Sequence, residues 1–188
     1  MAKLVIIYGT SEGQTRKVAE HIAGVARGHG HPVKVVDIKQ VPEDFELAAF
    51  DAAIIGASIH TGRYPATIVE FVKRQRPYLD RTPSAFFTVC LTAHDQTPAA
   101  KAQVQQYVTE FEQATGWQPA KVGIFAGALL YRQYNFVKRF MMRKISGSHG
   151  GETDTSRDWE YTDWDAVTRF AEDYLGAVDW VVTPFATA

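Results

Sequence analysis

Residues 4–15 read Leu-Val-Ile-Ile-Tyr-Gly-Thr-Ser-Glu-Gly-Gln-Thr, and this stretch decides the fold. Its first part, residues 4–8, is a continuous apolar run, which is typical of a parallel strand buried on both faces. A short turn rich in hydroxyl groups follows, and then Val18, Ile22 and Val25 recur at helical spacing. A buried strand that leads directly into a helix is the first half of a strand–helix–strand unit, so the stretch predicts a parallel sheet.

The same alternation of strand and helix continues along the chain. Four further short apolar runs predict strands over residues 33–36, 52–56, 84–91 and 122–126. We therefore predict an α/β fold with a doubly wound, five-stranded parallel sheet in the order 2-1-3-4-5. In such sheets, ligands bind beyond the carboxyl ends of the strands, so the loops after strands one, three and four are the places to look for chemistry.

Residues that favour helix ends support these assignments. Thr97 before Pro98 predicts an N-cap and Gly116 a helix end, while Pro65 can open the preceding helix. Near the C-terminus, Thr162 and Asp165 resemble a capping box that opens the last helix.

Composition places the chain among ordinary single-domain proteins. It has 188 residues, 46% of them hydrophobic, and a net charge of −1, which argues against a general nucleic-acid binder. The one cysteine, Cys90, excludes an internal disulfide, and no apolar run is long enough to span a membrane. We expect one domain over residues 1–176, with an insertion at about 129–160, followed by a tail over 177–188. We also expect a cytoplasmic protein, and the sequence leaves open a peripheral contact with the cytoplasmic face of the inner membrane.

The turn after the first strand has the chemistry of a phosphate site. Hydroxyl groups and the free N–H groups of a helix start can surround a phosphate dianion, and Gly13 permits close approach of the backbone. The alternative is that Thr10 or Ser11 only caps the helix. No GxxxxGK[ST] loop is present, and Gly24, Gly28 and Gly30 follow a helix rather than a strand, so neither a P-loop nor a dinucleotide fingerprint is indicated.

Thr10-Ser11-Glu12-Gly13-Gln14-Thr15 resembles the phosphate loop of flavodoxins. Further matches run from about Lys3 to Tyr174, and together they resemble the flavodoxin-type, menaquinone-dependent protoporphyrinogen oxidases (dehydrogenases) of bacterial haem synthesis. They comprise Ile55-Gly56-Ala57-Ser58-Ile59 with Gly62 and Tyr64, residues 83–86, Ala126-Gly127-Ala128-Leu129 with Tyr131, Gly150-Gly151-Glu152-Thr153-Asp154-Thr155 and Tyr161-Thr162-Asp163-Trp164.

This resemblance implies that FMN is the cofactor, with its phosphate on Thr10, Ser11, Glu12, Gly13, Gln14 and Thr15. Its ring is then expected between the loops after strands three and four, formed by Ser58, Ile59, His60, Thr61 and Gly62 and by Leu91, Thr92, Ala93 and His94. These residues are mostly small or aliphatic, which leaves the ring open to a substrate unless Tyr64 or Tyr131 covers it. The implied reaction oxidises protoporphyrinogen IX and passes the electrons to menaquinone or another quinone.

The histidines and the cysteine have less definite roles. His60 and His94 fall in the expected ligand loops, where either a proton-transfer role or an exposed loop position is consistent with the sequence. His21, His29 and His31 lie on or just after the first helix, and we expect them to be solvated. Cys90 ends a buried strand, so we expect a packed small side chain and not a reactive thiol.

Basic residues concentrate in the expected insertion. Residues 113–151 hold six bases and no acid, whereas residues 152–188 hold nine acids and two bases. Residues 135–145 have a partly amphipathic helical pattern, which favours either an interfacial helix on anionic lipid or a helix packed on its own domain. The candidates for lipid or substrate carboxylates are Arg132, Lys138, Arg139 and Arg143.

Three other functions remain compatible with this sequence. The chain could be an electron carrier that docks on redox partners, although such carriers are commonly strongly acidic. It could be an NAD(P)H:quinone reductase, since flavin enzymes can bind nicotinamide without a dinucleotide fingerprint. The third is a flavin-free phosphate-binding or scaffold protein of the same topology.

Overall fold

A five-stranded parallel sheet forms the centre of the molecule, in the order β2-β1-β3-β4-β5. The structure is a computed structural model that describes residues 1–129 and 156–182, without the side chains of 180–182. The strands are β1 (Leu4–Gly9), β2 (Val33–Asp37), β3 (Ala52–Ser58), β4 (Ser84–Cys90) and β5 (Lys121–Ala126). The predicted fold class and strand order are confirmed, and each predicted strand matches an observed one to within two residues.

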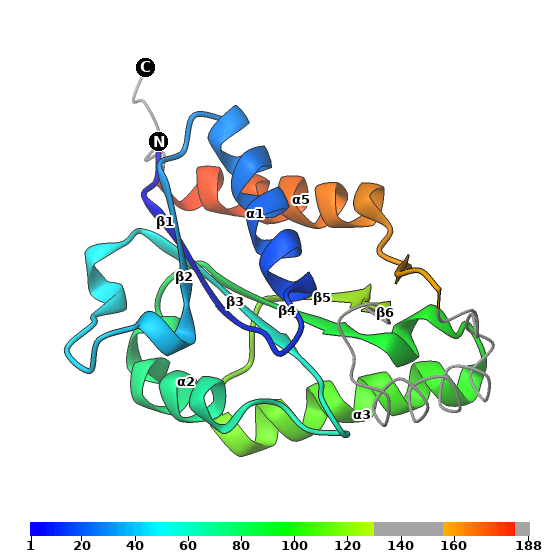
Figure 1. Ribbon diagram of the computed structural model, residues 1–188. Coiled ribbons are helices and arrows are strands. Elements are labelled where there is room, and N and C mark those ends of the chain that lie inside the picture. The colour runs from blue at the N-terminus through cyan, green and yellow to red at the C-terminus, as the bar shows by residue number, and fades with distance from the viewer. Residues whose placement is uncertain (130–155, 183–188) are drawn as a thin grey trace.

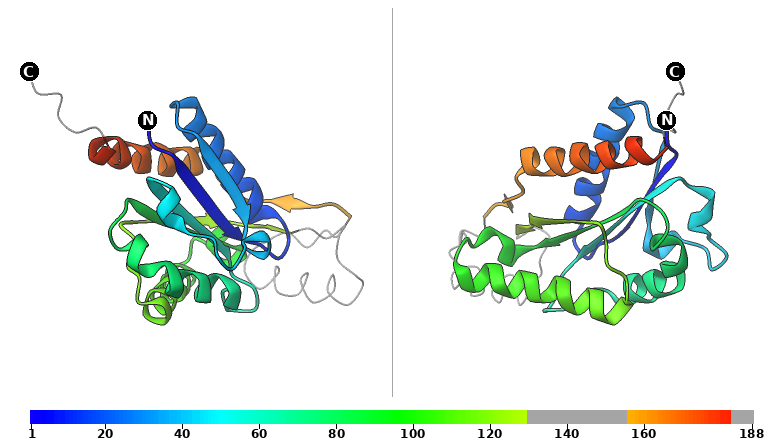
Figure 2. Two further views of the ribbon diagram at one scale, coloured as in Figure 1. Left: turned by 90° about the vertical axis from the view of Figure 1, so that its left-hand side faces the viewer. Right: turned by 180° about the vertical axis from the view of Figure 1, so that it is seen from behind.

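Helices cover both faces of this sheet (Figures 1 and 2). The first face carries α1 (Gln14–Gly28) and α5 (Trp164–Val182), and the second carries α2 (Ala66–Leu79) and α3 (Pro98–Thr115). Short 3-10 turns occur at Ile38–Gln40, Leu47–Ala49 and Leu91–His94. A separate two-stranded ribbon, β6 (Ala128–Leu129) and β7 (Trp159–Glu160), lies beyond the end of β5.

The apolar run of β1 is continuous because both of its faces are buried. Leu4 and Ile6 pack in the core beneath α1 and α5, whereas Val5 and Ile7 pack in the core against α2 and α3. Parallel pairing with β2 on one side and β3 on the other places β1 inside the sheet. The carboxyl end of β1 therefore lies beside that of β3, with the ends of β4 and β5 next along the same edge.

Most of the predicted helix ends are confirmed, and one is wrong. The Thr97 hydroxyl accepts a hydrogen bond from Ala100 N–H, and Gly116 ends α3 with a φ of 71°. The predicted capping box of Thr162 and Asp165 does not form. Asp163 caps α5 instead, because its carboxylate accepts from Ala166 N–H at 3.0 Å, and Thr162 is used in a buried contact described below.

The histidines after the first helix also differ from the prediction. His31 is buried: its Nδ1 accepts a hydrogen bond from Ala2 N–H, and its Nε2 lies 3.3 Å from the Asp179 carboxylate. His21 is half-buried, with its ring centroid 5.0 Å from that of Trp164. Helix α5 packs along α1, and residues of α5 contact both side chains: Thr168 and Trp164 contact His21, and Asp179 lies beside His31. His29 is exposed, as expected.

Part of the expected insertion is described and part is not. Pairing of β6 with β7 joins the two sides of the segment. Outside the described residues lie the helical pattern at 135–145 and the side chains of Tyr131, Arg132, Lys138, Arg139 and Arg143. Helix α5 continues to Val182, across the boundary expected at residue 176. Among the helices of the described residues, none is both long and apolar enough to cross a bilayer.

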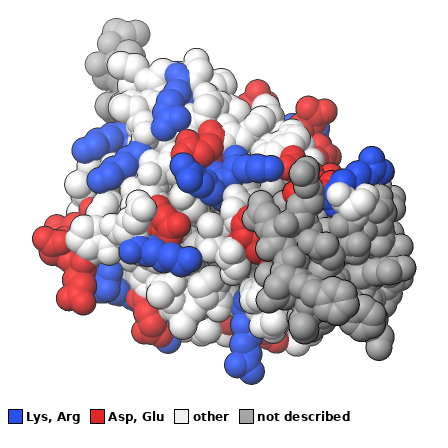
Figure 3. All heavy atoms as spheres, viewed as in Figure 1, with Lys and Arg blue, Asp and Glu red and all other residues white. Residues whose placement is uncertain are grey.

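The face shown in Figure 3 carries mixed charge. Basic and acidic side chains are interspersed over the described part of that face, and neither sign of charge forms a single broad area there. This pattern agrees with the small net charge of −1.

Replacement of Gly56 by alanine tests the tightest approach inside the sheet. A Cβ at Gly56 would overlap with the Phe87 ring on the neighbouring strand. We expect Gly56→Ala to lower the free energy of unfolding by about 1–3 kcal/mol, measured by chemical denaturation. The control is Gly24→Ala within α1, where a Cβ meets open space, and it should stabilise by about 0.5–1 kcal/mol. Equal effects at the two positions would contradict this account of the sheet.

Candidate functional site

A cleft lies at the carboxyl edge of the sheet, where the prediction placed the chemistry. It is lined by the loop after β1 and by the ends of β3, β4 and β5. The lining residues are Thr10, Ser11, Glu12, Gln14, Thr15, Ser58, Ile59, His60, Val89, Cys90, Leu91, Gly127 and Ala128. Loops distant in sequence meet here because parallel strands bring all of their carboxyl ends to one edge.

The loop after β1 leads into a helix that has no side-chain cap. Gly13 is the N-cap residue of α1, with a φ of 92°, and no side chain bonds to the first helical N–H groups. The Thr10 hydroxyl accepts from Gly13 N–H at 2.8 Å, which shapes the loop but does not cap the helix. A capping side chain usually contributes about 1 kcal/mol, so this helix start forgoes that stabilisation and keeps its N–H groups available to an anion.

Three buried polar atoms around the cleft have no protein partner within the described parts of the chain. They are Thr15 Oγ1, Ser58 Oγ and Gln14 Oε1. A buried polar group left unpaired costs about 1–3 kcal/mol, so a ligand or solvent molecule that pairs with it is favoured. Thr15 is fully buried and follows Gln14 in the first turn of α1. Uncapped N–H groups and an unpaired hydroxyl at one helix start fit the phosphate of a cofactor.

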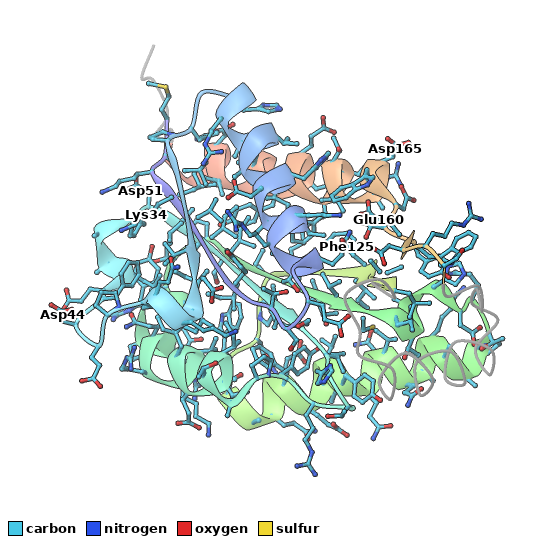
Figure 4. The ribbon with its side chains drawn as sticks, viewed as in Figure 1. Lys34, Asp44, Asp51, Phe125, Glu160 and Asp165 are labelled. Atoms are coloured by element: carbon cyan, nitrogen blue, oxygen red, sulfur yellow. The ribbon has the colours of Figure 1, made fainter. Side chains whose placement is uncertain are left out.

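The cleft is identified by its chemistry and not by its size. It encloses about 90 Å³, below the roughly 300–1,000 Å³ of pockets that hold a whole cofactor-sized ligand. It therefore accounts for the phosphate end, and the rest of a flavin would lie beyond it. A larger hollow of about 640 Å³ adjoins the amino ends of β1 and β2, near Lys34 and Asp44 (Figure 4), but no residue that lines it holds an unpartnered buried side-chain atom in the described parts of the chain.

The loop after β3 makes a tight turn with an uncommon backbone. His60 and Arg63 exchange backbone hydrogen bonds of 2.9 and 3.2 Å across Thr61 and Gly62. Both central residues have positive φ, 49° for Thr61 and 76° for Gly62. A β-branched residue in this conformation costs about 1–3 kcal/mol and is most often retained at a functional loop. Ile59 and His60 line the cleft, whereas Thr61 and Gly62 lie beyond it.

The loop after β4 forms a 3-10 turn over Leu91–His94. Leu91 lines the cleft, and Thr92, Ala93 and His94 do not. The ring of His94 instead stacks on that of Tyr161, with centroids 4.0 Å apart. The two loops expected to hold the ring therefore reach the cleft only through their first residues, which are Ser58, Ile59 and His60 after β3 and Leu91 after β4.

Cys90 is a packed residue in this wall, as predicted. It is 5% exposed, and burial raises the pKa of its thiol from 9.0 to about 11. A thiol with so high a pKa is protonated at neutral pH and is a poor nucleophile.

Sequence reasoning missed four lining residues, Val89, Cys90, Gly127 and Ala128. Gly127 and Ala128 follow β5, and their place at the end of a strand was a usable signal. Val89 and Cys90 read only as strand residues, so no local signal indicated them.

No phenylalanine, tyrosine or tryptophan of the described residues lines the cleft. Tyr64, one of the two tyrosines that could have covered the ring, is turned into the core. Its hydroxyl bonds to Thr88 Oγ1 at 3.1 Å, and its ring lies against those of Phe86 and Phe111. Burial raises the pKa of Tyr64 far above its usual value. Beyond the phosphate end, the described walls include the aliphatic side chains of Ile59 and Leu91 together with the imidazole of His60. No cluster of metal-binding side chains occurs in residues 1–129 and 156–182.

Comparison with known proteins identifies the family. A family model described as a flavodoxin domain matches residues 5–156, most of the chain. The chain belongs to the flavodoxin family. Among solved structures, it resembles oxidised flavodoxin 1 from Bacillus cereus, with a TM-score of 0.54 and 21% identity over 93% of this chain and 97% of that one. An apo NADH:FMN oxidoreductase is similar in fold, with a TM-score of 0.53, 12% identity and coverage of 94% and 90%.

Two relatives of this flavodoxin family member have names that specify an activity. A protein from Escherichia coli strain K12 is 35% identical over 180 residues, which cover 94% of this chain and 97% of the relative. One from Leishmania major is 38% identical over 173 residues, covering 92% and 74%. Both relatives are named protoporphyrinogen IX dehydrogenase [quinone].

Membership of the flavodoxin family implies FMN as the cofactor, as the sequence predicted. The residues present fit its phosphate, because the helix start supplies free N–H groups and the walls supply unpaired hydroxyls. Thr10, Ser11, Gly13 and Thr15 are the residues that would hold the phosphate, and Ser58 would meet the part of the cofactor next to it.

Thr15→Val tests the buried hydroxyl. Valine keeps the shape of the side chain and removes a group that has no partner, so the apo-protein should be as stable as wild type or more stable. We expect the Kd for FMN, measured by fluorescence titration of the apo-protein, to rise about tenfold.

Thr88→Val is the matched control, because the hydroxyl of this buried threonine does have a partner in Tyr64. It should lose about 1 kcal/mol of stability without a selective loss of FMN affinity. An unchanged Kd for FMN in Thr15→Val would remove Thr15 from the phosphate site.

Proposed function

We propose that this chain is an FMN-dependent enzyme that oxidises protoporphyrinogen IX to protoporphyrin IX and passes the electrons to a quinone. The observation that carries the proposal is its 35–38% identity, over nearly its whole length, to two proteins named for this reaction. The cleft contributes a second, independent argument, since it offers the phosphate end of FMN a fitting site.

The degree of the similarity favours the enzyme over a simple carrier. The two relatives named for the dehydrogenase reaction are 35% and 38% identical to this chain, whereas flavodoxin 1 from Bacillus cereus is 21% identical over a similar share of it. The small net charge of −1 also gives little electrostatic attraction for a basic redox partner.

In this reaction the chain binds and orients the cofactor and leaves one side of it accessible. The uncapped start of α1 and the Thr15 hydroxyl hold the phosphate, and the aliphatic side chains of Ile59 and Leu91 border the cleft where the ring would begin. When bound, FMN would supply the two-electron redox chemistry that links the substrate to the quinone, used three times for each porphyrinogen. Because Tyr64 is packed in the core, it does not block approach of a large planar substrate.

Menaquinone is the acceptor we propose, and peripheral contact with a bilayer would bring the chain to it. Four bases outside the described residues are the proposed contacts for anionic lipid or for the substrate's propionates: Arg132, Lys138, Arg139 and Arg143. This part of the proposal rests on the charge pattern of the sequence alone.

A steady-state assay with protoporphyrinogen IX and a menaquinone analogue tests donor and acceptor together. We expect protoporphyrin formation, followed by its fluorescence, that requires both FMN and the quinone. Anaerobic reduction of the bound FMN should proceed with protoporphyrinogen IX and not with NADPH. Reduction by NADPH alone would indicate the quinone-reductase alternative, and a purified protein that takes up no FMN would indicate the scaffold.

The double variant Arg139→Glu, Arg143→Glu tests the membrane contact. Each base near an anionic surface contributes about 1 kcal/mol, so reversal of two should lower liposome affinity more than tenfold. Quinone turnover with liposomes should fall in parallel. The control is the double variant Arg81→Glu, Lys101→Glu, which changes the net charge by the same amount at two exposed positions. Unchanged binding of the Arg139, Arg143 variant would exclude these two residues from a membrane role.

A further inference from the structure

The side chain of Gln14, the first residue of α1, is held by a segment far along the chain. Its Nε2 donates to Thr162 Oγ1 at 2.9 Å, and the Thr162 hydroxyl donates to the carbonyl oxygen of Ala126 at 2.7 Å. Gln14 is 5% exposed and Thr162 is 9% exposed, so these bonds are shielded from water. A continuous polar chain thus joins the start of α1 to the end of β5.

The direction of these hydrogen bonds is determined by the carbonyl of Ala126. A carbonyl oxygen only accepts, so it takes the single hydroxyl proton of Thr162. Thr162 Oγ1 can then only accept from Gln14, which requires the NH₂ group of Gln14 to face it. The amide therefore has one orientation, with Oε1 turned away from Thr162 and left without a partner in the described parts of the chain.

Glu160 of β7 adds a second anchor. Its carboxylate accepts from Lys17 Nζ at 2.7 Å and from Trp164 Nε1 at 2.9 Å, and the neighbouring Gln14 side chain also favours its charged form. Burial acts against the charge, but these donors outweigh it and hold the pKa of the Glu160 carboxyl below its usual value. Glu160 lines a hollow together with Gln14 and Lys17, on the side of the fold that carries α5 (Figure 4).

We propose that Thr162 is a positioning residue for the phosphate site and acts through Gln14, which it holds in one orientation at the first turn of α1. The inference rests on the proposed FMN site and goes beyond it. A capping side chain would occupy the N–H groups that the phosphate needs. Thr162 anchors the same turn through a side chain instead, so the turn is held while its N–H groups stay free.

This arrangement explains why Thr162 takes no part in the capping of α5. Its hydroxyl is committed to Ala126 and Gln14, and Asp163 supplies the cap in its place. Thr162 connects the loops after β1 and β5, two of the four strand ends that form the cleft.

Thr162→Val is the variant that tests the proposal. It keeps the shape of the side chain, removes the hydroxyl and introduces no charge. Thr162→Ser keeps the hydroxyl and should restore the function of the site. The matched control is Thr115→Val, another buried threonine, whose hydroxyl bonds to the Phe111 carbonyl at the far end of α3. The ligands are FMN and riboflavin, which differ only in the phosphate, and inorganic phosphate alone.

The expected result is a selective loss at the phosphate end. In Thr162→Val, the Kd for FMN should rise about fivefold to tenfold while that for riboflavin changes less than about twofold. Thermal stabilisation of the apo-protein by inorganic phosphate should disappear in Thr162→Val and remain in Thr162→Ser and in Thr115→Val. Adding Thr162→Val to Gln14→Leu should cause no further loss of FMN affinity, because the hydroxyl acts through Gln14.

Several results would overturn the proposal. Equal loss of FMN and riboflavin affinity in Thr162→Val would indicate a general structural role, and unchanged FMN affinity would remove Thr162 from the site. Additive effects of Thr162→Val and Gln14→Leu would show that Thr162 does not act through Gln14. Failure of the proposed function gives different results. Without an FMN site, wild-type protein would bind neither FMN nor riboflavin, and with another redox reaction FMN binding would persist while the protoporphyrinogen assay failed.

Discussion

The uncapped start of α1 is the constraint on which the candidate site depends. A helix start needs partners for its first N–H groups, and in this chain Gly13 offers no side chain to them. Those groups stay available only if the turn is stabilised in some other way. Whatever stabilises the loop after β1 must therefore leave those N–H groups free, because the site needs them to bind an anion.

The structure meets this requirement with contacts from the other end of the chain. Thr10 shapes the loop locally through Gly13, whereas Thr162 and Glu160 hold Gln14 from the segment that precedes α5. The parallel sheet makes this arrangement possible, because it brings the ends of β1 and β5 to the same edge while α5 packs along α1. Family membership accounts for the parallel sheet. The contacts of Glu160 and Thr162 come from the region around β7, beyond the end of the flavodoxin-domain match at residue 156.

The candidate site also shows why chemistry is a better guide than volume. The larger hollow lies at the opposite end of the sheet, near Lys34 and Phe45, and its walls hold no buried group that needs a ligand within the described residues. The smaller cleft has unpaired hydroxyls and a helix start together. The packing of Tyr64 against the core, away from the cleft, fits an enzyme whose cofactor meets a large substrate directly.

The sequence by itself determined the sheet and its order, and it singled out residues 10–15 as the candidate phosphate loop, because apolar periodicity, turn residues and a run of hydroxyl groups are local signals. Tertiary structure alone decided the rest. Three features depend on neighbours from distant segments: the burial of His31, the packing of Tyr64 against the core, and the place of Val89 and Cys90 in the cleft wall. Thr162 is the clearest case: its local pattern favours a helix cap, but a long-range partner, the Ala126 carbonyl, takes its only proton. Periodicity records which side of an element is buried, whereas the partner of a buried polar group depends on what the fold brings to it.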